Sequence, residues 1–137
     1  MRLEPYLSFG GQCEEALAFY ARCLGGEIVA LNRYAGSPLD TPKLPSEWRD
    51  KVLHAELQLE GTRILASDGM PGAARPSFSG ITLSLDLAED RHRAQRIFDA
   101  LAEGGQVRMP MTSTFFASRF GMLADRYGLG WMVVVAR

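Results

Sequence analysis

The 137-residue sequence lacks the features that mark several large classes of protein. It has no basic excess, because 15 Lys and Arg stand against 16 Asp and Glu, for a formal charge of −1. Electrostatic binding to nucleic acid or an anionic membrane needs such an excess, so we expect neither partner. The longest apolar runs, such as Trp131 to Ala136, are far shorter than the ~20 residues of a membrane span. Because Met1 to Pro5 lack the apolar stretch of a signal peptide, we expect a cytoplasmic protein.

Cysteine is scarce as well. Cys13 and Cys23 lie in one amphipathic segment, where ten helical positions separate them by about 15 Å. A disulfide requires Cα atoms within about 7 Å, so the two cannot pair within the chain. A free thiol on a helix is most often a small buried hydrophobe. A chain of this length can bury a core without disulfides or metal, and it is long enough for one domain built from two similar halves.

An internal repeat supports the two halves. A shift of 79 residues places Phe19 on Phe98 and the pair Gly25–Gly26 on Gly104–Gly105. Each half is predicted to contain one strand, one helix and three strands (βαβββ), over about 1–68 and 79–137 with a linker at about 69–78. We therefore predict a single domain of the α+β class.

Hydrophobic periodicity indicates the elements. Apolar residues at helical spacing predict helices over 12–24 and 89–103, each followed by a glycine that can end a helix. The strands are predicted over 3–9, 27–33, 52–59, 63–68, 81–87, 106–111, 116–124 and 131–136. The segment Tyr34 to Asp50 holds three prolines, which exclude a strand or helix interior, so it is either a lid or a surface loop.

Several short motifs, in order along nearly the whole chain, resemble the vicinal oxygen chelate superfamily of glyoxalase I, bleomycin-resistance proteins and extradiol dioxygenases. The similarity is greatest to its PhnB-like subgroup. The motifs are Pro5-Tyr6-Leu7, Cys13 to Tyr20, Ile64 to Asp68, Arg119 to Met122, Asp125, Tyr127-Gly128 and Trp131. The resemblance implies two curved sheets around a cup, and it implies a homodimer.

Metal-using members of this superfamily hold a divalent ion with four His or Glu side chains. Alignment on the motifs places those four positions at Pro5, Ile64, Gly80 and Val133, none of which offers a side-chain donor. Among the residues next to these positions, only Glu4 is a plausible ligand. We therefore expect neither a glyoxalase-type metal centre nor a cofactor.

The subgroup is often labelled by analogy as methyltransferase-like. A methyl donor is usually bound at a glycine-rich turn of a doubly wound parallel sheet, which this sequence does not predict. Its glycine pairs stand at the ends of helices, a common structural use. The sequence therefore gives no support to methyl transfer.

One strand carries the candidate chemistry. His54 and Glu56 share one face of the strand 52–59, so His54 is a candidate general base, with Glu56 as a second base. A three-residue turn at 60–62 would place His54 opposite Asp68, which could orient it; a two-residue turn would change the pairing. His54 could equally be a strand histidine that hydrogen-bonds a neighbour or faces solvent. A non-standard metal site of His54, Glu56 and Asp68 is a further hypothesis.

Other side chains are candidates for ligand contact. Aromatic residues suit an apolar or planar ligand, and Arg119 could clamp an anionic one or form a surface ion pair. Core packing is the alternative for the aromatic residues. The predicted ligand contacts are Tyr6, Asp68, Arg119, Tyr127 and Trp131.

These observations leave three hypotheses for the function. The first is a protein that binds or sequesters a small organic molecule, as bleomycin-resistance proteins do without a metal. The second is a metal-independent lyase or isomerase with His54 or Glu56 as its base. The third is a dimeric regulatory module with a vestigial cup.

Overall fold

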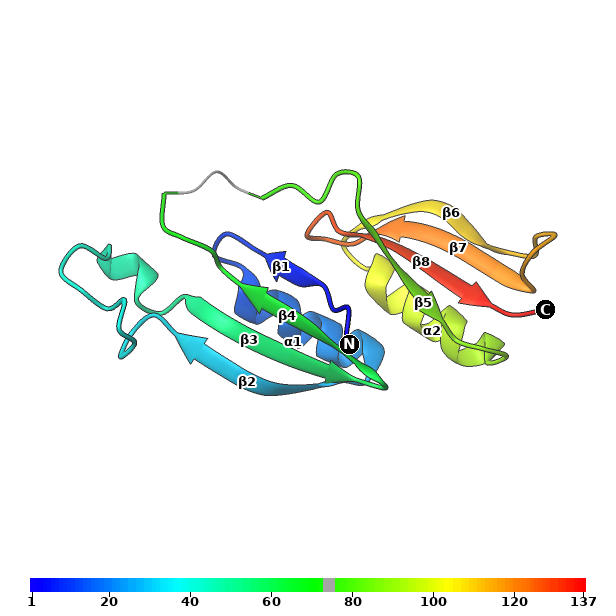
Figure 1. The fold of residues 1–137 in the computed structure, drawn as a ribbon. Helices are drawn as coiled ribbons and strands as arrows, with labels where there is room; N and C mark the ends of the chain where they lie inside the picture. The colour runs from blue at the N-terminus through cyan, green and yellow to red at the C-terminus, as the bar shows by residue number, and fades with distance from the viewer. Residues whose placement is uncertain (73–75) are drawn as a thin grey trace. The chain divides into compact units, whose positions relative to one another are not determined.

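The computed structural model describes residues 1–72 and 76–137. The chain forms two compact units, Met1–Pro76 and Ser77–Arg137, which are described here one at a time. Both contain an α-helix packed on a four-stranded mixed sheet, so the predicted α+β class and the two βαβββ modules are confirmed (Figure 1). No helix in the described ranges is both long enough and apolar enough to span a membrane.

The first unit begins with a short strand that leads into its helix. Its elements are β1 (Tyr6–Ser8), α1 (Cys13–Leu24), β2 (Glu27–Arg33), the 3-10 helix η1 (Ser46–Trp48), β3 (Val52–Leu59) and β4 (Thr62–Ser67). The strand order is β1-β4-β3-β2, with β1 parallel to β4 and the other neighbours antiparallel.

The second unit repeats this topology. Its elements are β5 (Thr82–Asp86), α2 (Arg91–Ala102), β6 (Gln106–Thr112), β7 (Arg119–Ala124) and β8 (Gly130–Val135). The strand order is β5-β8-β7-β6, with β5 parallel to β8. The bounds of β2 and β6 differ by the predicted shift of 79 residues. The connection that follows them is long in the first unit (34–51) and short in the second (113–118).

Helix α1 forms because its apolar residues recur at helical spacing and its charges suit the helix dipole. Cys13, Leu17 and Tyr20 are fully buried against the sheet. Two glutamates stand in the first turn and an arginine in the last, where they complement the dipole. Gly25 ends the helix with φ 75°, a conformation that glycine adopts without strain, and its N–H donates to the Ala21 carbonyl.

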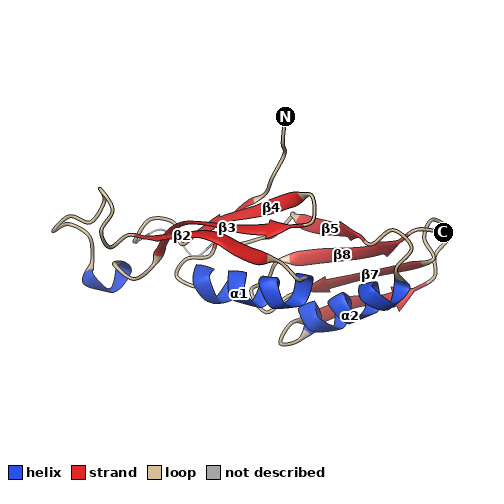
Figure 2. Cartoon of the chain, turned by 90° about the horizontal axis from the view of Figure 1, so that it is seen from below, coloured by secondary structure: helices blue, strands red, loops and turns tan. Residues whose placement is uncertain are grey.

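Each helix covers one face of its own sheet and leaves the other face without a helix (Figure 2). In the first sheet Ala55 and Leu57 of β3 and Ile64 and Ala66 of β4 are buried on the α1 side. Strand residues alternate between faces, so the residues between them lie on the other side, which we name the open face.

The connection 34–51 is held closely to its own unit. The Tyr34 hydroxyl donates to the Gly69 carbonyl at 2.7 Å, and the Trp48 indole N–H donates to the same oxygen at 3.1 Å. The segment extends beyond the ends of β2 and β3 (Figure 1), and the η1 turn within it was not predicted. These anchors support the surface-loop interpretation over the lid.

Several predicted bounds were wrong by a few residues. The first strand covers only Tyr6–Ser8, and β7 begins at Arg119 rather than at 116. The delay in β7 has a local cause, because the Thr114 N–H donates to the Ala117 carbonyl and closes a turn where the strand was expected.

Candidate functional site

The open face of the first sheet brings together polar side chains from three strands. His54 and Glu56 come from β3, Arg63 comes from β4, and Tyr6 comes from β1, where its neighbour Leu7 is buried on the α1 side. Tyr6 lies beside Leu65 in the register, and Glu56 lies beside the same leucine from the opposite strand. The predicted sharing of one strand face by His54 and Glu56 is thus what the structure shows.

Tyr6 and His54 form a direct pair. The Tyr6 hydroxyl lies 3.1 Å from His54 Nδ1, and the two ring centroids are 5.7 Å apart with the planes tilted by 33°. Because β4 lies between β1 and β3, the tyrosine side chain reaches across a whole strand to make this contact. Tyr6 remains 54% exposed and the His54 side chain 38% exposed, so both can meet another molecule.

The other ring nitrogen of His54 contacts the Glu56 carboxylate. His54 Nε2 lies 3.4 Å from Glu56 Oε2, and the second oxygen of Glu56 accepts a hydrogen bond from Arg63. Arg63 in turn binds Glu4 through two hydrogen bonds of 2.9 and 3.0 Å. The five side chains form one connected network on the open face, which we name the open-face network: Glu4, Tyr6, His54, Glu56 and Arg63.

The electrostatics of the network follow from its contacts. The hydrogen bond from Arg63 lowers the pKa of Glu4, and the hydrogen bond to Glu4 raises the pKa of Arg63. This pair therefore stays charged across the ordinary pH range. Burial raises the pKa of Tyr6, opposed by a hydrogen bond with Ser67, so its hydroxyl keeps its proton at neutral pH.

Asp68 does not orient His54. The hairpin has a two-residue turn, because Leu59 pairs with Thr62 and Ala55 with Ala66, which contradicts the three-residue turn on which that pairing depended. The Asp68 carboxylate is 2% exposed and accepts N–H bonds, each of 2.8 Å, from Gly11, Cys13 and Val52. It fastens the start of α1 to the start of β3, which is a structural role.

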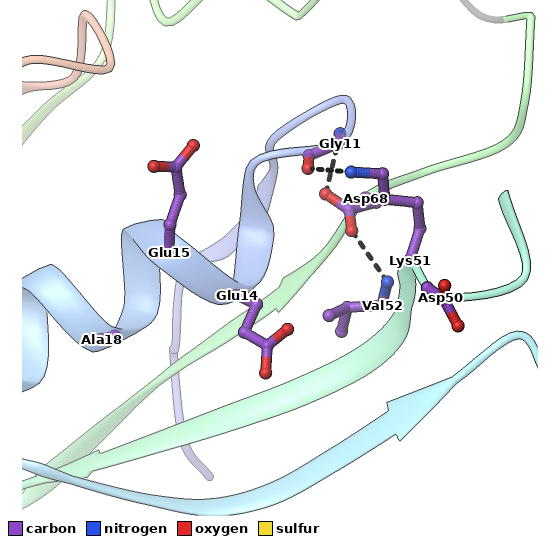
Figure 3. Close-up of a pocket in the computed structure, with 8 residues that line it drawn as sticks. All are labelled: Gly11, Glu14, Glu15, Ala18, Asp50, Lys51, Val52 and Asp68. Atoms are coloured by element: carbon purple, nitrogen blue, oxygen red, sulfur yellow. Dashed lines mark hydrogen bonds between the residues drawn. The ribbon is translucent and has the colours of Figure 1, made fainter. Parts of the chain in front are cut away.

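The structure shows a pocket on the α1 side of this unit, around Asp68 (Figure 3). Its volume is about 340 Å³. Lys51 Nζ donates to the Gly11 carbonyl at 2.9 Å, and the Asp68 carboxylate accepts from Gly11 and Val52. The pocket is lined by Gly11, Glu14, Glu15, Ala18, Asp50, Lys51, Val52 and Asp68. Of the predicted ligand contacts, Asp68 lines this pocket and Tyr6, Arg119, Tyr127 and Trp131 do not. A ligand contact by Asp68 stays a prediction.

Trp131 lies in the core of the second unit. It is 1% exposed, and its indole N–H donates to Asp125 Oδ2 at 2.8 Å. The other oxygen of Asp125 accepts from the backbone N–H groups of Tyr127 and Leu129. The Asp125 carboxylate therefore organises the turn between β7 and β8. A ligand contact by Tyr127 or Trp131 stays a prediction, and this geometry accounts for Trp131 by packing.

Arg119 lies on the helix-covered face of the second sheet. It pairs in the register with Val135, which is buried, and it alternates with Phe120 and Met122 of the opposite face. Its Nη1 donates to the neighbouring carbonyl of Ser118 at 2.9 Å. Anion binding by Arg119 stays a prediction, and it would occur away from the face that carries Phe120.

The four positions aligned with metal ligands do not fit a metal centre. Ile64 and Val133 are buried on the helix sides of their sheets, so neither lies on an open face. Their neighbours on the other face, Arg63 and Leu65 of β4 and Met132 and Val134 of β8, supply no imidazole or carboxylate.

Glu4, the remaining candidate, is committed to Arg63. Within residues 1–72 and 76–137, no group of three His, Cys, Asp or Glu side chains is placed to hold a metal ion. The hypothesis that His54, Glu56 and Asp68 share an ion is not supported, because the Asp68 oxygens point to backbone N–H groups.

The role of Arg63 was not predicted from the sequence. In the alignment Arg63 is only a neighbour of Ile64, and Glu4 is only a lone candidate ligand. The signal was present in the alternation of β4, since buried Ile64 and Ala66 place Arg63 on the same face as Glu56. The two-residue turn was needed to recognise it.

Comparison with known proteins agrees with this fold. Residues 1–134 match the family model described as 3-demethylubiquinone-9 3-methyltransferase. Protein YjdN of Escherichia coli (strain K12) is 36% identical over 100% of this chain and 97% of its own length.

Solved structures give the same result. The crystal structure of protein PA1353 from Pseudomonas aeruginosa has a TM-score of 0.86 at 39% identity, covering 99% of this chain and 98% of that one. The PhnB protein from Bacillus cereus has a TM-score of 0.78 at 27% identity, covering 99% and 100%. A glyoxalase-related enzyme from Fulvimarina pelagi shares the fold, with a TM-score of 0.66 at 16% identity, covering 98% and 87%.

The methyltransferase description belongs to the family model and, as a proposed activity, to the Bacillus cereus protein. The architecture of this chain does not provide the usual site for a methyl donor. Each sheet has one parallel pair of strands and two antiparallel pairs, which is unlike the doubly wound parallel sheet expected for a methyl donor. The family match, the relative YjdN and the paired modules together show that this chain belongs to the PhnB-like family of the glyoxalase/bleomycin-resistance superfamily.

Proposed function

We propose that this chain binds a small organic molecule, and that the ligand contacts the open face of the first sheet through Tyr6 and His54. The observation that carries the proposal is the Tyr6–His54 pair itself. Two side chains able to hydrogen-bond are held at 3.1 Å, on the face without a helix, and both stay half exposed.

The support around this pair strengthens the proposal. A solvated sheet face needs no fixed arrangement of its polar groups, whereas a binding site needs its contacting groups held by neighbouring ones. Glu56 contacts His54, and Glu56 is held by Arg63, which is held by Glu4. The contacts of Glu56, Arg63 and Glu4 thus hold the His54 ring, and His54 holds the Tyr6 hydroxyl.

A thermal-shift screen tests the proposal. The library pairs compounds of similar shape and different charge, such as benzylamine, benzyl alcohol and benzoate, together with planar metabolites. A ligand present at 100 times its Kd stabilises the folded state by about 2.7 kcal/mol, which raises Tm by about 8 °C in a domain of this size.

The variants Tyr6→Phe and His54→Gln should remove most of the shift given by any hit while leaving the Tm of the free protein nearly unchanged. Arg33→Gln is the matched control, because Arg33 forms a similar ion pair with Glu14 on the same unit, outside the open-face network. An absence of hits over a broad library would contradict the proposal and favour the regulatory module. Hits unaffected by both variants would also contradict it, because the ligand would then bind elsewhere on the chain.

A second candidate function is a metal-independent lyase or isomerase. It is favoured by the chain of contacts from Tyr6 through His54 to Glu56, which could move a proton. In this hypothesis His54 is the base and acts through Tyr6: the Tyr6 oxygen takes a proton from a carbon acid while its own proton passes to His54 Nδ1. Glu56 then faces the imidazolium at Nε2 and stabilises its charge.

Proton exchange in D2O distinguishes this candidate from simple binding. Carbonyl compounds incubated with the protein and EDTA should lose the NMR signals of their α-protons, and His54→Gln should abolish that loss. Binding without any exchange across the screen would reject the enzyme hypothesis.

The homodimer implied by the resemblance stays a proposal about assembly. Sedimentation equilibrium across a hundredfold range of concentration tests it. A mass of one chain, 15.1 kDa, at every concentration would reject the dimer.

A further inference from the structure

We propose that Arg63 is a positioning residue which, through Glu56, holds neutral His54 as the Nε2–H tautomer and so makes the Tyr6 oxygen an acceptor for donor groups of the ligand. The ligand class follows: an amine or hydroxyl is favoured over a carboxylate or phosphate. The ligand part rests on the proposed function, whereas the tautomer is measured without any ligand.

The first step is that Arg63 fixes the position of Glu56. Arg63 uses Nε and Nη2 to bind both oxygens of Glu4 and keeps Nη1 for Glu56. The guanidinium is planar and its donors have fixed directions, so the Glu4 pair sets where the Glu56 carboxylate can lie. All three side chains are partly buried, which limits the screening of their charges by water.

The second step is that Glu56 selects the tautomer of His54. In neutral imidazole one ring nitrogen carries the proton and the other carries a lone pair. A lone pair on Nε2 would face the Glu56 carboxylate oxygen 3.4 Å away and be repelled by it, whereas an N–H there is attracted. Nδ1 is then the acceptor.

The third step is that the tautomer sets the role of Tyr6. With a lone pair on Nδ1, the hydrogen bond of 3.1 Å requires the Tyr6 O–H to be the donor. Because the Tyr6 proton is used for His54, the Tyr6 oxygen can only accept further hydrogen bonds, from Ser67 and from a ligand. This side chain is the most exposed of the network.

The charges around the pair are compatible with the same ligand class. Glu4 and Glu56 bring two negative charges and Arg63 brings one positive charge, while the positive charge of Arg2 also acts on Glu4. The neighbour of His54 on β2 is Asn32, which is uncharged. The charged group in contact with His54 is the Glu56 carboxylate, so a second carboxylate placed at Tyr6 would be repelled by it, whereas an ammonium or a neutral donor would not.

Nuclear magnetic resonance of the protein labelled with 15N-histidine tests the tautomer. The chain has two histidines, so the spectrum contains two side chains, and exposed His92 on α2 serves as the internal control. At about pH 9, where an ordinary imidazole is neutral, His54 should show a protonated Nε2 and an unprotonated Nδ1, in at least about tenfold excess. A protonated Nδ1 in the wild type would overturn the proposal.

Two variants test the positioning role. In Arg63→Gln and in Glu56→Gln the excess of the Nε2–H tautomer should fall severalfold towards the value measured for the urea-unfolded chain. In the control Arg33→Gln it should not change. Because Glu56→Gln is close in shape to the wild type, it keeps the test valid if Arg63→Gln does not fold. An unchanged tautomer ratio in folded Glu56→Gln would overturn the proposal.

The matched compounds of the thermal-shift screen test the ligand class. Benzylamine and benzyl alcohol should bind at least tenfold more tightly than benzoate, and Tyr6→Phe should reduce that preference. A preference for benzoate would overturn the ligand class. An absence of all hits would reject the proposed function itself, and the tautomer measurement would still decide the role of Arg63.

Discussion

The substitution Asp68→Asn tests the structural role of this buried carboxylate. Oδ1 accepts from the N–H groups of Gly11 and Cys13, and Oδ2 accepts from that of Val52. An asparagine has one acceptor oxygen, so its amide nitrogen must face one of these N–H groups, donor against donor. The change is nearly isosteric and leaves no cavity, so its cost is electrostatic.

The expected loss of stability follows from two contributions. One hydrogen bond to a charged acceptor contributes about 1.5–3 kcal/mol, and a buried N–H without a partner costs about 1–3 kcal/mol. The two contributions overlap, so we expect a loss of about 3 kcal/mol, or roughly 10 °C in Tm. Asp50→Asn, at an exposed neighbouring position, is the control and should change stability by less than about 0.5 kcal/mol.

Urea denaturation followed by tryptophan fluorescence measures both variants. The same transitions are also followed by circular dichroism, because a chain of two units must be shown to unfold in two states. Coincident transitions by the two methods would confirm two-state unfolding. A loss below about 1 kcal/mol in Asp68→Asn would show that the three hydrogen bonds do not hold α1 to β3. It would also reopen a role for Asp68 in the candidate site.

Two further predictions concern the cores of the units. Asp125→Asn should destabilise the chain by about 2–3 kcal/mol and change the near-ultraviolet circular dichroism of Trp131, because Asp125 accepts from that indole and from two backbone N–H groups; an unchanged spectrum would contradict this. Burial raises the pKa of the Cys13 thiol to about 12, so the unfolded state alone ionises above about pH 9 and stability should fall as pH rises from about 9 towards 12. The variant Cys13→Ala should remove up to about 1.4 kcal/mol per pH unit of that slope, and equal slopes in the two proteins would contradict the burial of the thiol.

Much of the fold could be predicted because its signals are local. The bounds of β2 and β3 agree with the predicted 27–33 and 52–59, since strand alternation and the glycines Gly26 and Gly61 mark them clearly. Helix α1 begins one residue after its predicted start and ends at its predicted end. It could be predicted this closely because its buried residues recur at helical spacing. The repeated topology followed from the order of these elements.

The site was harder to predict because it depends on register and on contacts between distant strands. The sequence left two lengths open for the turn after β3, and the structure has the two-residue turn at Glu60–Gly61. With that turn, the partner of His54 on β4 is no longer Asp68. The contact of Tyr6 with His54 crosses an intervening strand, so no spacing along the chain predicts it.

Buried acidic residues caused a further difficulty. Asp68 and Asp125 both follow a strand, as catalytic carboxylates often do, yet each accepts backbone N–H bonds that hold a turn or a helix start. A catalytic carboxylate and a carboxylate that accepts backbone N–H bonds therefore have the same sequence pattern. Burial and hydrogen-bond partners separate them, and both properties require the structure.

Chemical-shift mapping with a ligand from the thermal-shift screen locates the ligand on the chain. If the ligand binds the open-face network, the largest changes in the amide and side-chain spectra occur at Tyr6 and His54, with changes also at Glu56 and Arg63. Changes centred on Gly11, Glu14 and Lys51 at the α1-side pocket, with the signals of Tyr6 and His54 unaffected, would contradict binding at this network.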